Sequence, residues 1–207
     1  FDGASTKDLE EVLSLGIISG VTTNLSFCKK QMDLVDLSYL DLLKEIKKKI
    51  TNQNNKLSYS VQVTSDQKDR IAEEALMLNE ELSENIDLKI KIPLSYENFK
   101  IIDKLISKKI KINATCVTSF LQGLAAANAG CTYVSFFWGK MTDEDIDPYK
   151  IVSEFKNLLI KNSLDKSCKI LVGSIRQTKV IREAFVAGAD IVTIQNDSFK
   201  KILNQQK

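Results

Sequence analysis

One lysine lies near the end of a predicted buried strand. Residues 88–93 read LKIKIP, and this run predicts a strand over residues 86–92. Side chains alternate along a strand, so the apolar ones are expected to meet helices while Lys89 and Lys91 point inward. Burial disfavours a charged amine, so the pKa of Lys91 should fall and its neutral amine could attack a ketone to form an imine. A solvated lysine at a strand end is the alternative.

Other polar side chains stand where further strands are predicted to end. They are Asp2, Thr22, Asn24, Gln62, Asn113, Thr115, Ser135, Ser174 and Arg176. A carboxylate can exchange protons with sugar hydroxyls, and amides can both donate and accept hydrogen bonds. Each residue alone is more often a strand-end cap. Together they indicate a polar site around one lysine.

The residue types also exclude several chemistries. The chain has no histidine, which removes Ser-His and Cys-His nucleophile pairs and the commonest metal ligand. Its four cysteines form no Cys-x-x-Cys pair, so we expect free thiols rather than a zinc site or a disulfide framework. No metal or other cofactor is therefore expected.

Short apolar runs alternate with helical patterns along the chain. Strands are expected at 20–23, 56–63, 86–92, 110–115, 132–136, 169–173 and 191–194, with Phe1 ending an eighth. Helices are expected at 37–50, 71–82, 99–106, 120–129, 151–159 and 180–187. Asp66 and Thr118 are expected as N-caps, and Gly130 and Gly188 as helix ends.

This alternation predicts the fold class. Repeated βα units give a parallel sheet covered by helices. Eight units in 207 residues favour an α/β fold with one domain, residues 1–207, forming a single (β/α)8 TIM barrel. An open doubly wound sheet is the alternative, but the glycine-rich loop typical of that fold is missing after the first strand. Catalytic groups of a barrel stand at the C-terminal ends of its strands.

Six segments resemble the transaldolase and fructose-6-phosphate aldolase family, in the same order and over essentially the whole chain. They are Phe1-Asp2, residues 20–24 (GVTTN), residues 88–93 (LKIKIP), residues 112–115 (INAT) with Ser119 and Gln122, residues 133–139 (YVSFFWG) and residues 173–176 (GSIR). The resemblance implies a metal-independent enzyme that forms a Schiff base with a sugar phosphate.

The resemblance also implies a role for each matching residue. Lys91 would form the Schiff base and Asp2 would act as acid and base, while Gln62 and Thr115 would hold a catalytic water. Thr22, Asn24, Asn113, Ser135 and Phe137 would bind substrate, the two asparagines and Ser135 at its dihydroxyacetone part. Lys140, Ser174 and Arg176 would bind phosphate.

Several positions depart from the family pattern. Leu25 replaces a proline, and Lys140 replaces an arginine, which keeps the charge but loses the two-pronged guanidinium. The glutamine at position 62 matches the fructose-6-phosphate aldolase branch, whereas the phenylalanine at position 137 favours transaldolase. Lys89 stands where an apolar residue is usual. It either pairs with an acid that the sequence does not identify or lowers the pKa of Lys91 by its charge.

Three possible functions therefore remain, two enzymatic and one of binding alone. They are a transaldolase of the pentose phosphate pathway, a fructose-6-phosphate aldolase that releases free dihydroxyacetone, and a non-catalytic sugar-phosphate-binding barrel. The formal net charge is +2, which gives no reason to expect nucleic acid or an anionic membrane as partner. The expected partners are small sugar phosphates and further copies of the chain, in the cytoplasm.

Overall fold

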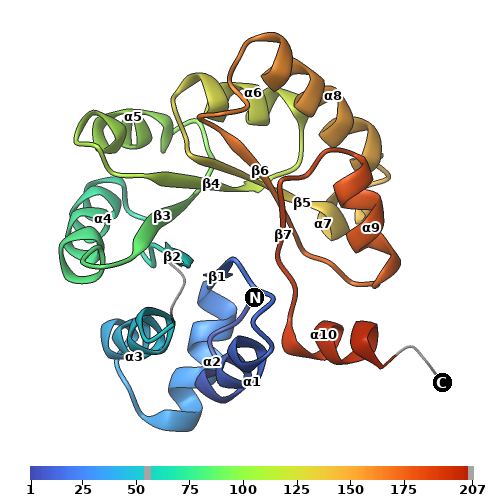
Figure 1. Cartoon of the computed structure of the whole chain (residues 1–207). Helices are drawn as coiled ribbons and strands as arrows, with labels where there is room; N and C mark the ends of the chain where they lie inside the picture. The colour runs from blue at the N-terminus through green and yellow to red at the C-terminus, as the bar shows by residue number, and fades with distance from the viewer. Residues whose placement is uncertain (54–56, 205–207) are drawn as a thin grey trace. The chain divides into compact units, whose positions relative to one another are not determined.

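A computed structural model of the chain describes residues 1–53 and 57–204. Its contacts divide the chain into two compact units. Unit 1 comprises Phe1–Ile90 with Gln195–Lys207, and unit 2 comprises Lys91–Ile194. The division falls inside one strand, β3 (Asp87–Pro93), so each unit holds part of that strand. The elements are labelled in Figure 1.

Unit 1 holds the first strands and five helices. The strands are β1 (Gly20–Thr22), β2 (Ser58–Gln62) and the first residues of β3, in that order. Strands β1 and β2 are parallel, with Gly20 opposite Ser58 and Thr22 opposite Ser60. The helices are α1 (Thr6–Ser14), α2 (Leu25–Val35), α3 (Tyr39–Thr51), α4 (Lys68–Leu82) and α10 (Asn196–Leu203).

Unit 2 holds the end of β3, four further strands and five helices. The strands β4 (Ile112–Val117), β5 (Tyr133–Phe137), β6 (Lys169–Gly173) and β7 (Ile191–Val192) lie side by side in sequence order and pair in parallel. The helices are α5 (Phe99–Ser107), α6 (Phe120–Asn128), α7 (Trp138–Asp143), α8 (Pro148–Lys161) and α9 (Lys179–Val186). Parallel strands joined through helices confirm the predicted α/β class.

The strands have buried apolar side chains on the faces that the helices cover. In unit 2, Phe136 of β5 meets Phe155 of α8 edge to face, with ring centroids 5.2 Å apart. Helix α6 contributes Gly123, where a β-carbon would lie only 2.7 Å from the Phe136 ring. The small residue thus lets α6 approach the sheet closely.

The seven internal strands were predicted correctly. The segment at Phe1, expected to end an eighth strand, forms no named strand but does pair with β1. Asp2 makes a parallel bridge to Thr22. The Thr22 amide donates to the Phe1 carbonyl, the Gly3 amide donates to the Thr22 carbonyl, and the Phe1 ammonium donates a 2.9 Å hydrogen bond to the Gly20 carbonyl. The expected start of the second strand, Lys56, lies outside the described residues.

All six predicted helices are present, while α1, α2, α7 and α10 were missed. The two predicted N-caps were also wrong by one residue. Helix α4 begins after Gln67 rather than Asp66, and α6 begins after Ser119 rather than Thr118. Ser119 is the better cap because it forms a reciprocal capping box with Gln122. Gly130 and Gly188, with φ of +88° and +107°, do follow helix ends as predicted.

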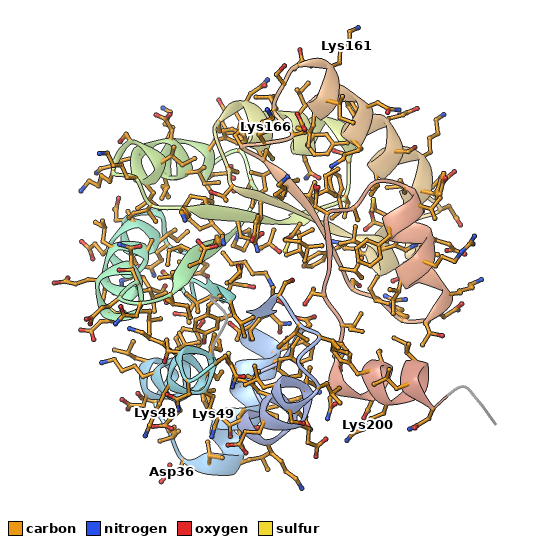
Figure 2. All side chains as sticks on the ribbon, viewed as in Figure 1. Asp36, Lys48, Lys49, Lys161, Lys166 and Lys200 are labelled. Atoms are coloured by element: carbon orange, nitrogen blue, oxygen red, sulfur yellow. The ribbon has the colours of Figure 1, made fainter. Side chains whose placement is uncertain are left out.

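The lysine-rich run 47–49 lies near the C-terminal end of α3. Lys48 and Lys49 lie in the last turn of α3, where cations are favourable, and Figure 2 shows them at the surface. Lys49 forms an ion pair with Glu10. Among the described helices, none combines the length and apolar character needed to cross a membrane.

Candidate active site

The predicted site residues divide between the two units. Unit 1 contains Asp2, Thr22, Asn24 and Gln62, and unit 2 contains Lys91, Asn113, Thr115, Ser135, Phe137, Lys140, Ser174 and Arg176. Asn113 and Ser135 lie within β4 and β5, and the others lie near the C-terminal ends of strands or in the segments that follow them.

In unit 1, Asp2 is held against the end of β1. The Thr22 hydroxyl donates a 2.8 Å hydrogen bond to Oδ1 of Asp2. Thr22 is buried, whereas Asp2 keeps partial exposure. Thr22 thus orients the carboxylate, while Asp2 still lines a cavity.

The other two predicted residues of unit 1 are fixed by neighbouring helices. Asn24 is the N-cap of α2, and its side-chain oxygen accepts a 3.0 Å hydrogen bond from the Phe27 amide. Gln62 ends β2, and its backbone oxygen accepts a short hydrogen bond from the Tyr39 hydroxyl. Tyr39 is the first residue of α3 and had not been recognised from the sequence. It fixes the backbone at Gln62.

In unit 2, Lys91 lies on the last part of β3 and is only 6% exposed. The charges of Lys91 and Lys140 act on the thiol of Cys116. Burial raises the pKa of Cys116, and the two lysines and the Thr115 hydroxyl lower it in part. Cys116 is half-buried and has a left-handed backbone, with φ of +62°. The spacing of Cys116 in the sequence did not reveal that this thiol lies near Lys91.

Strands β4 and β5 carry three buried polar residues of the predicted site, Asn113 and Thr115 on β4 and Ser135 on β5. Ser135 donates a 2.6 Å hydrogen bond to Oδ1 of Asn113, and both residues are at most 1% exposed. Thr115 is fully buried, and its hydroxyl makes no well-formed hydrogen bond within the described residues. A buried hydroxyl without a partner is unusual, because leaving it unsatisfied costs about 1–3 kcal/mol. A bound water or substrate would remove that cost.

The predicted phosphate-binding residues gather where β5 and β6 end. Phe137 ends β5, and two residues later the Gly139 amide donates a 3.1 Å hydrogen bond to the Ser174 carbonyl. Ser174 itself has a left-handed φ of +59°. A β-carbon on Gly139 would lie 2.5 Å from the Ser174 carbonyl oxygen and 2.9 Å from Nε of Arg176. The glycine therefore allows the two segments to touch.

Both cations of this cluster already have carboxylate neighbours at the C-terminal end of α7. Arg176 donates from both terminal nitrogens to the two oxygens of Asp143. This pairing lowers the pKa of Asp143 and raises the pKa of Arg176. Lys140 lies 3.9 Å from Glu144. All four side chains are about half exposed, so the pairs are weak enough for an anion to displace.

Lys89 has the acidic partner that the sequence left open. Its ammonium contacts the Asp87 carboxylate and donates a 3.0 Å hydrogen bond to the Ser58 hydroxyl. Lys89 is 2% exposed, whereas the Asp87 side chain is 30% exposed. The ion-pair interpretation is thus confirmed. Asp87 stands two positions before Lys89 on one strand, so the period-two pattern was a signal that could have revealed it.

A family model described as transaldolase/fructose-6-phosphate aldolase matches residues 1–207. The chain belongs to this family. Membership confirms the resemblance seen in the sequence and the predicted fold class, the α/β barrel.

Curated relatives agree over nearly the whole chain. A protein named "Probable transaldolase" from Thermoplasma volcanium is 34% identical over 206 residues, covering 100% of this chain and 87% of the relative. One of the same name from Clostridioides difficile is 33% identical, covering 99% of this chain and 86% of the relative. A third protein of this name, from Lactiplantibacillus plantarum, is 30% identical, covering 97% of this chain and 86% of the relative.

Solved structures of lower identity share the fold alone. A mutant flavocytochrome b2 with benzoylformate gives a TM-score of 0.60 at 15% identity, covering 88% of this chain and 50% of the other. A second mutant flavocytochrome b2, with pyruvate bound, gives a TM-score of 0.56 at 16% identity. The match covers 76% of this chain and 47% of the other. This chain thus spans about half of each of those chains.

The surroundings of the four cysteines predict a single reactive thiol. Cys28, Cys131 and Cys168 are at most 1% exposed, and burial raises the pKa of Cys131 and Cys168 to about 12. Only the thiolate is nucleophilic. We therefore expect one alkylated cysteine, Cys116, in the native protein and four after denaturation.

Mass spectrometry after brief iodoacetamide treatment measures this. Because burial leaves the pKa of Cys116 raised, the labelling rate should climb as the pH increases from 7 to 9. Labelling of Cys131 or Cys168 at a comparable rate would contradict the buried placement of these thiols.

Proposed function

We propose that the chain is a class I transaldolase that transfers a dihydroxyacetone unit between sugar phosphates through a Schiff base on Lys91. The observation that carries this proposal is one lysine, 6% exposed, on β3 of a chain that belongs to the transaldolase/fructose-6-phosphate aldolase family. A buried amine carries a desolvation cost when charged, which favours the neutral nucleophile.

In the proposed reaction, the Lys91 amine condenses with the ketose carbonyl and water leaves. Asp2 then takes the proton from the hydroxyl on the carbon that departs as an aldehyde, and the carbon–carbon bond breaks to leave an enamine. The enamine attacks a second aldehyde, Asp2 returns the proton, and water releases the product from Lys91. General acid–base help of this kind contributes about 10²- to 10⁴-fold.

The remaining residues bind or position groups in this scheme. Gln62 and Thr115 hold the water, and the unsatisfied hydroxyl of Thr115 supports that role. Thr22, Asn24, Asn113, Ser135 and Phe137 bind the substrate. The hydrogen bond between Ser135 and Asn113 supports a shared role at the dihydroxyacetone part.

Fructose-6-phosphate aldolase is the second candidate, because Gln62 matches that branch. There the same enamine is protonated to an iminium, and water hydrolyses the bond to Lys91 and releases free dihydroxyacetone. The deciding experiment supplies fructose 6-phosphate with and without an aldose phosphate acceptor. A transaldolase forms a new ketose phosphate only when the acceptor is present, whereas an aldolase releases dihydroxyacetone without it. If neither product forms with any pair of sugar phosphates, the chain is a non-catalytic binding barrel.

Phosphate binding is proposed for Ser174, Arg176 and Lys140. Each charge-assisted contact is worth about 1.5–3 kcal/mol, or about 10- to 150-fold in affinity. Arg176→Ala should therefore raise KM for phosphorylated substrates by that factor and leave KM for dihydroxyacetone nearly unchanged. Lys140→Arg should lower KM for phosphorylated substrates or leave it unchanged.

Steady-state kinetics with matched phosphorylated and unphosphorylated substrates test this. Equal weakening of both by Arg176→Ala would make Arg176 structural. Loss of activity in Lys140→Arg would indicate a different acceptor and argue against the transaldolase assignment.

The proposed chemistry needs no metal or other cofactor. An imine activates the carbonyl without a Lewis acid, and residues 1–53 and 57–204 hold no group of three potential metal ligands. We expect full activity after treatment with EDTA and dialysis. Loss of activity that added Mg²⁺ or Zn²⁺ restores would contradict this. A cytoplasmic homo-oligomer acting on sugar phosphates of the pentose phosphate pathway completes the proposal.

A further inference from the structure

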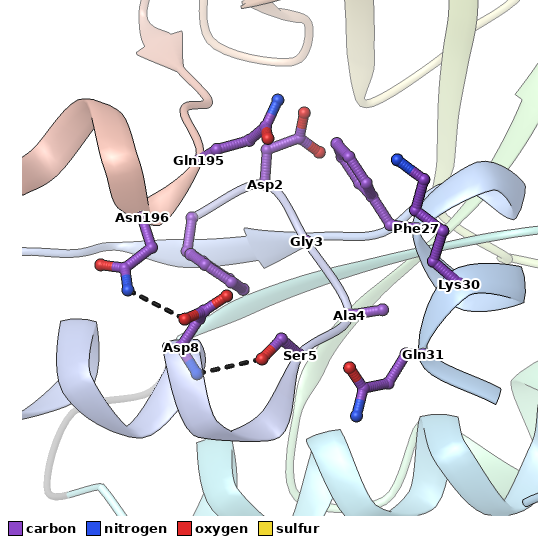
Figure 3. Close-up of a pocket in the computed structure, with 11 residues that line it drawn as sticks. Asp2, Gly3, Ala4, Ser5, Asp8, Phe27, Lys30, Gln31, Gln195 and Asn196 are labelled. Atoms are coloured by element: carbon purple, nitrogen blue, oxygen red, sulfur yellow. Dashed lines mark hydrogen bonds between the residues drawn. The ribbon is translucent and has the colours of Figure 1, made fainter. Parts of the chain in front are cut away.

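Unit 1 contains a cavity of about 140 Å³ beside Asp2. The segment before α1, together with α2 and the start of α10, forms its walls (Figure 3). The wall includes Asp2, Phe27, Lys30, Gln31 and Gln195. Figure 3 shows the Asp2 carboxylate between the amide of Gln195 and the ring of Phe27. Lys30 reaches the same rim from α2.

The size of the cavity limits what it can hold. A cavity of about 150 Å³ takes a ligand as large as benzene, which has six heavy atoms. Pockets for larger ligands usually measure about 300–1,000 Å³. This cavity is therefore too small for a whole sugar phosphate and fits a fragment of three or four carbons with their hydroxyls.

The lining selects a neutral, hydroxylated fragment. Amides both donate and accept hydrogen bonds, as hydroxyl groups do, and the Phe27 ring offers an apolar surface to carbon atoms. Lys30 adds one positive charge, but Asp2 and Asp8 line the same cavity with carboxylates. A phosphate dianion would be repelled by both acids, so it is the wrong ligand for this place.

Gln195 is exposed at the rim, and its backbone is anchored through the next residue. It precedes α10, and its side chain makes no capping hydrogen bond there. The next residue, Asn196, is 6% exposed and donates to Asp8 (3.0 Å) and to Glu11 (2.8 Å). Those two bonds tie the start of α10 to α1. The backbone that carries Gln195 therefore loses little freedom on binding.

We infer that this cavity holds the hydroxylated chain of the acceptor aldehyde, and that Gln195 and Lys30 determine its specificity. The inference rests on the proposed function through Asp2. In the proposed cleavage, Asp2 takes the proton from the hydroxyl group on the carbon that becomes the aldehyde. The cavity that Asp2 lines is thus next to the aldehyde half of the substrate, not the dihydroxyacetone half.

Two acceptors of equal length, glyceraldehyde and propionaldehyde, test the inference because only the first carries extra hydroxyls. With fructose 6-phosphate as donor, Gln195→Ala should lower kcat/KM for glyceraldehyde by about 2- to 12-fold, the effect of one neutral hydrogen bond. It should change kcat/KM for propionaldehyde by less than about 2-fold. Lys30→Met should act in the same direction. The matched controls Gln53→Ala and Lys29→Met, which are exposed and outside the cavity, should change neither.

A binding measurement needs no turnover. Erythritol, an unreactive four-carbon polyol, should shift the backbone amide NMR signals of Gln195 and Asn196 in the wild type and not in Gln195→Ala. Borohydride trapping at Lys91 is measured in parallel. The cavity assignment is overturned if Lys91 is trapped but Gln195→Ala affects both acceptors equally and erythritol shifts no amide signal of Gln195 or Asn196. Erythritol shifts without trapping support a polyol site and refute the proposed function.

Discussion

Lys91→Met is expected to lower kcat/KM for transfer by about 10⁴-fold or more, the scale of losing a covalent nucleophile. Methionine has a similar length and is apolar, so it suits a side chain that is 6% exposed. The fold should survive, since replacing a buried charge by an apolar group is often neutral or stabilising. Circular dichroism and thermal unfolding check that point.

Borohydride trapping gives the direct test of the same residue. Fructose 6-phosphate and borohydride should add mass to one peptide of the wild type, the one containing Lys91, and to none in Lys91→Met. Lys89→Met is the matched control, because it removes the neighbouring buried lysine of the same strand and should still be labelled. Labelling at Lys89, or activity retained in Lys91→Met, would refute the assignment.

Asp87→Ala is expected to destabilise the protein by about 3–5 kcal/mol. Asp87 is the carboxylate partner of Lys89, whose side chain is 2% exposed. Removing one member of a buried ion pair leaves an uncompensated charge inside the protein, and this costs about that much. The Ser58 hydroxyl, 3.0 Å from the ammonium, remains but carries no charge.

Lys89→Met separates this explanation from simple loss of contacts. It removes the buried charge itself and leaves Asp87, which is 30% exposed, in reach of water. We expect its unfolding free energy to stay within about 1 kcal/mol of the wild type, or to rise. Urea denaturation measures both variants. Equal destabilisation by the two changes would mean that Lys89 contributes through packing or through the Ser58 bond instead.

Lys89→Met also addresses whether Lys89 influences Lys91. If the charge of Lys89 lowers the pKa of Lys91, the variant should shift the rising limb of the pH–rate profile to higher pH. With Asp87 beside it, the charge of Lys89 is largely offset, so a small shift is the expected result.

The strands and the main helices followed from periodicity, because apolar alternation and helical spacing reflect burial directly. The strand around Lys91 and the helix starting near residue 37 are examples. Helix α1 was missed because its buried apolar residues, Leu9, Val12 and Leu13, span little more than one turn, and α2 was missed because Cys28 is its one buried residue. The α6 cap was misplaced by one residue because Thr118 and Ser119 are chemically alike, and only the Gln122 contact distinguishes them.

The site could be predicted only as residue types at strand ends. Sequence order indicates that Asn113 and Ser135 end neighbouring strands, but not that they share a hydrogen bond. Asp143 and Tyr39 were not predicted, since contacts with Arg176 and the Gln62 backbone join residues 33 and 23 positions apart. Whether each predicted residue performs its assigned step stays a prediction for the variants above.

The close contact at Gly139 has a consequence for redesign of this enzyme. Even the smallest side chain there would collide with the Ser174 carbonyl, 2.5 Å from the added carbon. In a saturation library, position 139 should therefore accept almost nothing. Position 140 projects into solvent and should accept many residues. Evolution or an engineer can thus exchange the charge beside Arg176 without disturbing the backbone that carries it, so the charge of this proposed phosphate site is easier to alter than its scaffold.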